Sequence, residues 1–583
     1  MVIVLKSLLV YLKKYKKETV LAPLFKMLEA SFELLVPLVV TAIIDVGIGN
    51  RDLGYILRMG GLMIALGVIG LICSITAQFY AAKAAVGFSA GVKHALFAHI
   101  QKLSFTEMDK LGTSTMITRM TSDINQVQSG VNLVLRLFLR SPFIVFGAMI
   151  MAFTIDVKAA LIFVITIPLL SVVVFGIMLI SIPLYKKVQA GLDHVLGITR
   201  ENLTGIRVIR AFHMEEEEKE RFTTSNDSLT RVQMFVGRIS ALMNPVTYVI
   251  VNAATIALLY VGAIRVDSGI LTQGNVVALV NYMSQILIEL VKLANLIITV
   301  TKAMACAGRI EKVFELKSSM EEREEIENRE KTVSDVAVEF KQVGLTYQDA
   351  GEESLSNINL QVKKGQTIGI IGGTGSGKTS FVHLIPRFYD ATRGEVLVDG
   401  RNVKDYSLKE LRGKVGMVMQ KAVLFQGSIR ENLLWGNENA SEEELNEALC
   451  IAQAAEFVAE KPGGLNFLLT QGAKNLSGGQ KQRLTIARAL VRKPEILILD
   501  DSASALDFAT DAALRQSIRG MEGSPTVFIV SQRAASIQYA DQIIVLDDGK
   551  IAGHGTHEQL LKECSVYQEI YYSQFPKEVA CHG

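Results

Sequence analysis

The residues at positions 372–379 have the types and spacing of a phosphate-binding loop. They read GGTGSGKT and fit the pattern G-x-x-x-x-G-K-[ST], with an apolar strand-like run before them and a helix-like run after them. Glycines let backbone N–H groups point at phosphates, and a helix N-terminus adds partial positive charge. Lys378 would then reach the β- and γ-phosphates, and the Thr379 hydroxyl would bind Mg²⁺. The residues predicted to contact a nucleoside triphosphate here are Gly372, Gly373, Thr374, Gly375, Ser376, Gly377, Lys378, Thr379 and Ser380.

A second motif, at residues 496–501, ends in two carboxylates. It reads ILILDD, and its four aliphatic residues predict a buried strand whose end brings Asp500 beside the glycine loop. A carboxylate at this place can hold the hydration shell of Mg²⁺. Asp501 then occupies the position expected for a base that activates water.

A third motif lies between these two, at residues 475–483. Ser477 is suited to cap a helix, and Gly478 and Gly479 leave backbone donors open. The apolar spacing that follows continues a helix, so this is another helix end able to receive an anion. One domain has no evident need for two such ends unless the second one serves the nucleotide of another subunit.

Composition separates the chain into two halves. The chain has 583 residues, too many for one hydrophobic core. Half of its residues are hydrophobic, and these are concentrated in the first 300 positions. The net charge of +2 argues for neither a nucleic-acid partner nor an acidic one, and we expect no nucleic acid. The five cysteines are far apart and predict neither a disulfide framework nor a metal site. The N-terminus lacks the pattern of a cleavable signal.

Six apolar runs are long enough to cross a bilayer, which takes about 20 residues. The predicted spans are 21–44, 59–82, 133–155, 159–185, 239–264 and 276–301. Lysines at positions 13–17 place the N-terminus in the cytoplasm. The long segments 83–132 and 186–238 are then cytoplasmic helical extensions that reverse near 104–112 and near 211–214.

Several charged side chains fall inside the predicted spans. Glu29, Glu33, Glu289 and Lys292 are the clearest of them. Charges at membrane depth indicate function because burying an unpaired charge costs several kcal/mol. Two alternatives stay open: these residues line a substrate cavity, or they lie near the span ends or pair with one another.

The predicted fold is a six-span α-helical membrane domain followed by an α/β phosphate-loop domain. We expect a transmembrane domain at 1–315, a charged linker at 316–335, a nucleotide-binding domain at 336–575 and a tail at 576–583. The protein is expected in the cell membrane with its nucleotide-binding domain in the cytoplasm.

Residues 476–480 read LSGGQ, the signature of ATP-binding cassette (ABC) proteins, and nearly the whole chain resembles a half-transporter of the type IV ABC exporter family. The resemblance implies ATP and Mg²⁺ as cofactors and two chains that share each ATP between one chain's glycine loop and the other's signature. It implies that Tyr347 stacks on adenine and that residues 504–507 form the D-loop. It also implies that Gln420 contacts Mg²⁺ and water and links them to the contacts with the transmembrane domain. The two reversals resemble coupling helices. The residues expected to contact the partner's nucleotide are Ser477, Gly478, Gly479 and Gln480.

Two positions depart from the family pattern. Asp501 stands where the family has glutamate, and Gln532 stands where it has the switch histidine. Aspartate is shorter by one methylene, and a misplacement of about 1 Å can cost ~10²-fold in rate. Glutamine lacks the titrating imidazole. The resemblance therefore implies a degenerate site in a heterodimer, with a partner chain that supplies the competent glutamate and histidine.

The function favoured by these motifs is ATP-driven efflux of hydrophobic or amphiphilic compounds across the lipid bilayer, as in multidrug exporters. The alternatives are a lipid or peptide translocator, a siderophore importer of the same fold, and a homodimeric exporter with slow hydrolysis at both sites. A regulatory membrane subunit gated by ATP is an alternative of another class. ATP-driven uptake of a dye into inverted vesicles separates pumping from gating.

Overall fold

The structure is a computed structural model that describes residues 8–320, 334–347, 350–502, 504–521 and 523–575. The chain divides into two compact units. The first unit comprises residues 1–101 and 112–316, and the second comprises residues 102–111 and 317–583. Most of the predicted linker and the predicted tail lie outside the described residues. The segment 102–111 interrupts the first unit in sequence but belongs to the second.

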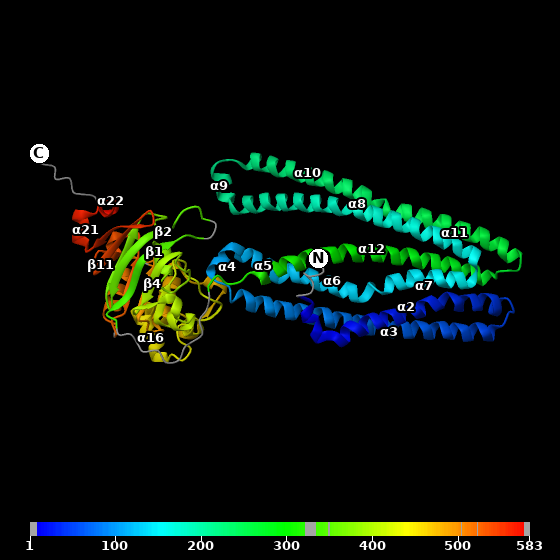
Figure 1. The fold of residues 1–583 in the computed structure, drawn as a ribbon, viewed down its shortest axis with the longest axis horizontal. Coiled ribbons are helices and arrows are strands. Elements are labelled where there is room, and N and C mark those ends of the chain that lie inside the picture. The colour runs from blue at the N-terminus through cyan, green and yellow to red at the C-terminus, as the bar shows by residue number, and fades with distance from the viewer. Residues whose placement is uncertain (1–7, 321–333, 348–349, 503, 522, 576–583) are drawn as a thin grey trace. The chain divides into compact units, whose positions relative to one another are not determined.

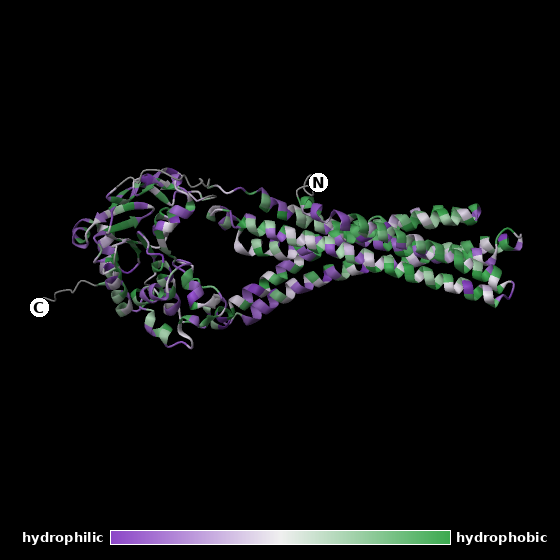
Figure 2. Ribbon diagram, turned by 90° about the horizontal axis from the view of Figure 1, so that it is seen from below, coloured by the Kyte–Doolittle hydropathy of each residue, from purple (hydrophilic) through white to green (hydrophobic). Residues whose placement is uncertain are grey.

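Six long helical segments in the first unit confirm the prediction of six membrane spans. Their bounds are Leu9–Ile48, Leu53–Ile100, Thr113–Ile155, Val157–Thr204, Glu215–Asp267 and Gln273–Glu315. At 1.5 Å per residue, a helix such as α8 (Val157–Thr204) is about 70 Å long, more than twice the hydrocarbon thickness. Hydrophobic residues dominate one end of these helices and polar residues mix into the other (Figure 2), as expected for spans that continue into water.

The helices of the first unit run side by side (Figure 1). The first, second and sixth segments are formed by α2 (Lys16–Ala42), α3 (Leu53–Ile100) and α12 (Gln273–Glu315), with η1 (Leu9–Tyr15) and η2 (Ile43–Ile48) flanking α2. The third is divided into α5 (Thr113–Thr118), η3 (Arg119–Asp123), α6 (Ile124–Leu137) and α7 (Arg140–Ile155). The fourth is α8, and the fifth consists of α10 (Glu215–Ala241) and α11 (Met243–Asp267).

The charged residues of the spans form one network that joins α2, α7 and α12. Arg140 donates to Glu289 at 2.6 Å and to Glu33 at 2.7 Å. Lys292 donates to Glu289 at 2.7 Å, and Lys26 to Glu29 at 2.6 Å. The pairing alternative therefore describes these side chains, with Arg140 as the central cation. The side chains of Glu33 and Lys292 are 40% and 41% exposed, respectively.

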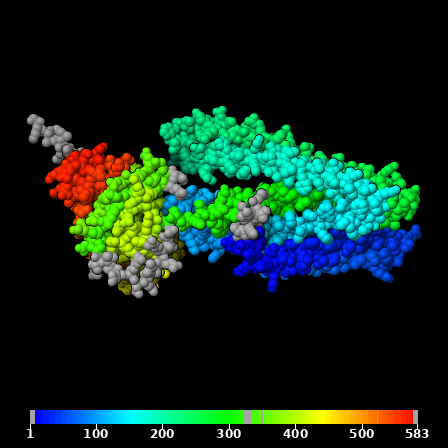
Figure 3. Space-filling view, in the orientation of Figure 1, coloured from blue at the N-terminus to red at the C-terminus, as the bar shows by residue number. Residues whose placement is uncertain are grey.

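A short helix lies at each predicted reversal. The first is α4 (Phe105–Leu111), which belongs to the second unit. The second lies in the turn between the short helix α9 (Ile206–Ala211) and α10, at the predicted residues. In the described structure the hairpin formed by the end of α8, α9 and α10 packs chiefly on itself, and a hollow separates it from the helices beside it (Figure 3). Large apolar side chains on this hairpin are exposed, among them Leu203, Phe212 and Phe235.

The second unit is built on a sheet with the strand order β12-β11-β3-β10-β9-β6, parallel except for β12, and a smaller antiparallel sheet with the order β2-β1-β4-β5. The strands of the larger sheet are β3 (Thr367–Gly372), β6 (Val415–Val418), β9 (Ile496–Asp500), β10 (Thr526–Val530), β11 (Gln542–Asp547) and β12 (Lys550–Gly555). The remaining strands are β1 (Val336–Leu345), β2 (Leu355–Lys363), β4 (Arg393–Val398), β5 (Arg401–Asn402), β7 (Gly427–Ser428) and β8 (Leu468–Leu469).

Helices cover the faces of this unit. After α4, their bounds are α13 (Lys378–His383), α14 (Leu408–Lys414), α15 (Ile429–Leu434), α16 (Glu442–Ile451), α17 (Ala455–Ala459), α18 (Gly478–Leu490), α19 (Phe508–Arg519), α20 (Ala534–Ile537), α21 (His557–Glu563) and α22 (Ser565–Gln574), with short 3₁₀ turns at Val403–Asp405, Gly464–Asn466 and Gln471–Ala473.

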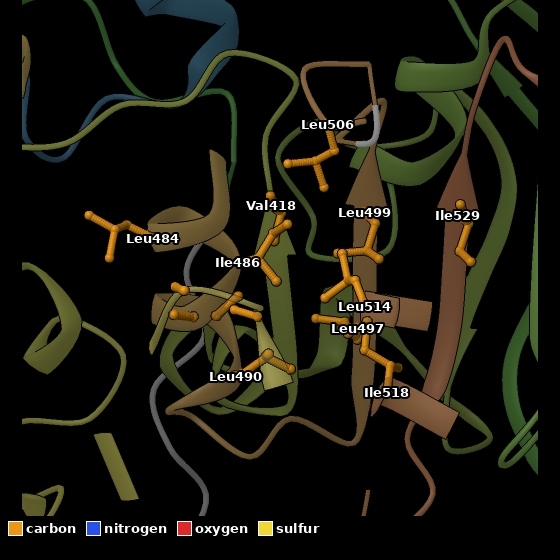
Figure 4. Close-up of a cluster of buried hydrophobic side chains, with 14 of the residues drawn as sticks. Val418, Leu484, Ile486, Leu490, Leu497, Leu499, Leu506, Leu514, Ile518 and Ile529 are labelled. Carbon is orange, nitrogen blue, oxygen red and sulfur yellow. The ribbon is translucent and has the colours of Figure 1, made fainter. Parts of the chain in front are cut away.

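The central strand β9 is buried on both faces, as its unbroken aliphatic run predicts. Leu497 and Leu499 pack with α18 and α19 in one core (Figure 4), whereas Ile496 and Ile498 face the core shared with the antiparallel sheet. Alternate side chains of β9 therefore belong to different cores. This fixes the register of β9 with its neighbours, because a slip of one residue would exchange the two faces.

The register of the parallel strands brings the sequence motifs to one edge. Val530 is paired with Asp500 on one side and with Ile370 on the other. The glycine loop after β3, the carboxylates after β9 and Gln532 after β10 therefore emerge together, at the carboxyl ends of the strands where α/β proteins bind ligands.

Candidate functional site

A polar cavity of about 440 Å³ lies at this edge of the sheet, within the second unit. It contains ten of the residues predicted from sequence: Thr374, Gly375, Gly377, Lys378, Thr379, Ser380, Gln420, Asp500, Asp501 and Gln532. It also contains residues that the motifs did not predict: Glu352, Glu353, Ser354, Val530, Ser531, Asp548 and Gly549. Segments separated by more than a hundred positions thus meet in one pocket.

The loop between β3 and α13 has the open backbone that phosphates require. Gly375 and Gly377 adopt left-handed conformations with φ of 85° and 90°. A Cβ at Gly377 would lie 2.7 Å from the Ser354 carbonyl oxygen, and one at Gly372 would lie 2.1 Å from that of Leu546. Glycine is therefore required at these positions both by the space around them and, at Gly377, by its backbone angles.

Lys378 folds its ammonium group back over the loop. Its Nζ donates to the carbonyl oxygens of Gly372 at 2.9 Å and Gly373 at 2.6 Å. Burial lowers the pKa of Lys378, and the carboxylates of Asp501 and Asp500 oppose that shift. The ammonium group is thus held where the phosphate groups of a nucleotide would replace the carbonyl oxygens as acceptors.

Thr379 and Asp500, two of the residues predicted to bind Mg²⁺, contact each other. The Thr379 hydroxyl donates to Asp500 Oδ1 at 3.2 Å, and Asp500 is almost fully buried. Burial raises the pKa of Asp500 to about 6, helped by the nearby charge of Asp501 and opposed by the Thr379 hydrogen bond and by Lys378. A divalent cation would favour the ionised carboxylate, because opposite charge favours the charged form.

Asp501 and Gln420 face each other across the cavity. Gln420 Nε2 donates to Asp501 Oδ2 at 3.4 Å, and Asp501 has a left-handed backbone with φ of 45°. Burial raises the pKa of Asp501, against the effects of the Gln420 hydrogen bond and of Lys378. Gln532 is exposed at the cavity wall. The two residues that depart from the family pattern therefore lie in one cavity with the glycine loop.

Tyr347, the residue predicted to stack on adenine, lies beside the loop but does not line the cavity. Its hydroxyl donates to Ser380 Oγ at 2.9 Å, and its ring packs edge-on against Tyr389 with 5.0 Å between centroids. Tyr389 in turn donates to Asp109 Oδ2 of α4 at 2.6 Å. Phe105 of α4 packs on Phe388 at 4.7 Å. The aromatic residue is thus linked through Tyr389 to the short helix α4.

His383 is a residue at this site that the motifs did not single out. Its Nε2 lies 3.9 Å from Asp500 Oδ2, and burial lowers the pKa of His383 to about 4, so the imidazole is neutral at physiological pH. The available signal was its position four residues after Thr379, on the same face of the helix. Ser354 and Gly549 carried no comparable signal, because turns outside the motifs bring them to the loop.

The signature residues lie outside this cavity. Ser477 caps α18 by accepting from the Gln480 N–H at 3.3 Å, and the Gln480 side chain accepts from the Ser477 N–H at 3.1 Å. The reciprocal bonds form a capping box that leaves the end of the helix rigid. Ser477 and Gly478 are exposed, so the chain does not bring its own signature to its own glycine loop.

The residues of the cavity fit Mg²⁺-ATP. The loop offers backbone donors and Lys378 to the phosphates, and Thr379, Gln420 and Asp500 offer oxygen ligands, which Mg²⁺ prefers. When bound, Mg²⁺ would neutralise charge on the β- and γ-phosphates. The loop and Lys378 would hold the phosphates, and Thr379, Gln420 and Asp500 would hold the ion, whereas Asp501 and Gln532 line the same cavity.

Comparison with known proteins places both halves of the chain. Residues 19–290 match the family described as ABC transporter transmembrane region, and residues 355–504 match the one described as ABC transporter. The uncharacterized ABC transporter ATP-binding protein YfiB of Bacillus subtilis is 36% identical, over 98% of this chain and 99% of that protein. An ATP-dependent lipid A-core flippase of Desulfotalea psychrophila is 32% identical, over 82% of this chain and 83% of the flippase.

A solved structure shares the fold. The structure of a bacterial Atm1-family ABC exporter with ATP bound matches with a TM-score of 0.79 and 23% identity, over 96% of this chain and 99% of the exporter. The two domain matches and the full-length relative show that this chain belongs to the ABC transporters, with the transmembrane region and the ATP-binding domain in one polypeptide.

Proposed function

We propose that the protein is one half of a heterodimeric ABC exporter that moves hydrophobic or amphiphilic compounds out of the cell. The observation that carries the proposal is the pair Asp501 and Gln532 in a cavity whose other predicted residues follow the family pattern. ATP would bind at this cavity with Mg²⁺ and be hydrolysed slowly. The same chain would complete a competent site on its partner.

The position of α4 supports coupling between this cavity and the membrane. The helix lies between α3 and α5 in sequence, and both of these belong to the first unit. Yet α4 packs into the second unit, where Asp109 accepts from Tyr389 and Glu107 accepts from the Ser319 N–H at 3.2 Å. A movement of the ATP-binding domain would therefore pull on two membrane helices through continuous backbone.

Two surfaces support a second chain. The exposed Ser477 and Gly478 at the start of α18 have no phosphate to contact within this chain, and a partner's nucleotide would supply one. The hairpin at α9 exposes Leu203, Phe212 and Phe235 outside the apolar span. Exposed apolar patches of this kind mark interaction sites. Both features fit the dimeric assembly of ABC exporters.

Transport is tested with inverted membrane vesicles that contain this chain and its partner. ATP should drive accumulation of a hydrophobic dye, and a non-hydrolysable analogue should not. Lys378→Ala should weaken nucleotide binding at this site, whereas Lys404→Ala, at an exposed position away from the cavity, should transport normally. ATP-dependent channel-like leakage without accumulation would overturn the export proposal in favour of a gated subunit.

Lipid translocation is the second candidate, because the relative at 32% identity is named a lipid A-core flippase. Reconstituted proteoliposomes that contain a headgroup-labelled lipid distinguish it from dye efflux. ATP-dependent movement of the labelled lipid between leaflets, without dye accumulation in vesicles, would favour the lipid substrate. Brisk ATP turnover by the purified chain alone, abolished by Asp501→Asn, would instead identify a homodimer.

A further inference from the structure

His383 lies behind the carboxylate that is proposed to hold Mg²⁺. It follows Thr379 by one helical turn, and its Nε2 stands 3.9 Å from Asp500 Oδ2. The side chain is only 12% exposed, and Nε2 is buried without a hydrogen-bond partner among the described residues. A buried imidazole nitrogen without a partner costs free energy, so its position calls for an explanation.

The two carboxylate oxygens of Asp500 face different side chains. Oδ1 accepts from Thr379 at 3.2 Å, and Oδ2 faces His383. The distance of 3.9 Å is too long for a hydrogen bond, but a shift of about 1 Å brings it to the usual N–H···O length of about 2.9 Å. A neutral imidazole that donates from Nε2 would then fix the orientation of the carboxylate.

The other neighbours of His383 lead to α4. Its ring packs against Tyr389 at 6.1 Å with an angle of 18°, and against Phe388 at 5.3 Å. Tyr389 donates its hydroxyl to Asp109 of α4 at 2.6 Å. All of these residues belong to the second unit. A short chain of contacts therefore runs from α4 through two aromatic rings to the metal-binding carboxylate.

We propose that His383 is a positioning residue for Asp500 and that α4, through Tyr389, sets the distance between them. When α4 and Tyr389 press the imidazole toward Asp500, the hydrogen bond forms and the carboxylate is held in the orientation that binds Mg²⁺. Partners that orient a metal ligand typically affect metal affinity 10- to 100-fold. The inference rests on the proposed role of Asp500 as a ligand, and it adds a route by which a membrane-linked helix changes metal affinity.

The test measures Mn²⁺ binding by electron paramagnetic resonance on the full-length chain with saturating ATP, together with ATP affinity in EDTA. His383→Leu should weaken Mn²⁺ binding about 10- to 100-fold and leave metal-free ATP affinity unchanged. His383→Gln, which keeps a donor, should retain most of the affinity. His554→Leu, on the edge strand β12, is the matched control and should behave as the wild type.

Tyr389→Phe removes only the hydroxyl that reaches Asp109, and Asp109→Asn weakens the acceptor. Each should reduce Mn²⁺ affinity severalfold without loss of folding. Unchanged Mn²⁺ affinity in His383→Leu, or an equal loss of metal-free ATP affinity, would overturn the positioning role. If the leucine variant does not fold, the glutamine variant and Tyr389→Phe decide, and wild-type affinity in Tyr389→Phe refutes the link to α4.

Asp500→Asn distinguishes the role of His383 from the role of Asp500 as a metal ligand. If that variant binds Mn²⁺ as tightly as the wild type, Asp500 is not a metal ligand and the assignment of the metal site fails. If Asp500→Asn loses Mn²⁺ while His383→Leu does not, the metal site stands and only the role of His383 fails. Because the readout is binding, slow hydrolysis at this site does not obscure either result.

Discussion

Gln420 and Asp501 are joined by a hydrogen bond of 3.4 Å across the mouth of the nucleotide cavity. The carboxylate of Asp501 is held toward Gln420, on a side chain shorter by one methylene than the glutamate of the family pattern. Under the proposed function, we expect this shorter carboxylate to be poorly placed to activate a water on the γ-phosphate, since a displacement of about 1 Å can cost ~10²-fold in rate.

Restoring the longer side chain should therefore restore hydrolysis. In an assembled pair whose partner glutamate has been neutralised, Asp501→Glu combined with Gln532→His should raise ATP turnover at this chain's site at least about 10-fold. Phosphate release measures it. Asp501→Glu alone should give a smaller gain, and no gain in the double variant would show that geometry elsewhere in the cavity limits the rate.

Removing the ammonium group of Lys378 should abolish tight nucleotide binding. Charge-assisted hydrogen bonds contribute about 1.5–3 kcal/mol each, so Lys378→Ala should weaken ATP binding roughly 10- to 100-fold. Binding of a fluorescent ATP analogue measures it. Lys404→Ala is the control, and similar losses in both variants would mean that the effect is not local to the loop.

The buried carboxyl of Asp500 should make the nucleotide-free chain depend on pH in a defined direction. Its folded-state pKa of about 6 exceeds the ordinary value of about 3.9, so the folded state carries a cost above pH 6 that disappears as the pH falls through 6 toward 4. Asp500→Asn removes this cost and should stabilise the nucleotide-free chain by on the order of 2–3 kcal/mol at pH 7.5.

Thermal unfolding without nucleotide, at pH 7.5 and at pH 5, tests this pH dependence. The gain in melting temperature from Asp500→Asn should be largest at pH 7.5 and should shrink at pH 5. A gain of equal size at both values would mean that the carboxylate charge is not its source.

Arg140 should be essential to the packing of the membrane helices. Removing it leaves the carboxylates of Glu33 and Glu289 without their shared cation, and breaking a buried pair costs about 3–5 kcal/mol. Arg140→Ala should lower the unfolding temperature in detergent markedly. Arg136→Ala, four residues earlier at the end of α6, should not, because Arg136 has no ion pair in the described part of the chain and its Nε has no hydrogen-bond partner there.

Adding Glu33→Ala to Arg140→Ala should recover part of the loss, because Glu33 pairs with Arg140, whereas Glu289 keeps its ion pair with Lys292. Size-exclusion profiles show whether each variant remains folded. Equal destabilisation by Arg136→Ala and Arg140→Ala would show that the network has no special role.

The convergence of Thr379, Asp500 and Gln532 was predictable, because each follows an apolar strand and the carboxyl ends of parallel strands meet. The six spans were predictable from length and hydropathy. The environment of Tyr347 was not predictable from the sequence. Its ring rests on Tyr389, a contact set by tertiary neighbours without any sequence period, and the link from Tyr389 to Asp109 depends on α4 packing into the second unit.

The pairing of the charged residues in the spans was also not predictable from the sequence. Glu289 and Lys292 were visible as intramembrane charges one turn apart, but the pairing of Glu289 with Arg140 depends on the approach of α7 to α12. His383 was visible only as a spacing of four from Thr379, which many surface histidines share.

Under the proposed function, this chain's own cavity holds ATP while hydrolysis occurs at the partner's glycine loop. The most direct measurement is steady-state ATP turnover of the purified pair with one carboxylate removed at a time. Replacing the partner's catalytic glutamate by glutamine should abolish turnover, and Asp501→Asn should change it less than about twofold. Comparable loss of turnover in both variants would mean that the two sites hydrolyse ATP alike and that this chain's site is not degenerate.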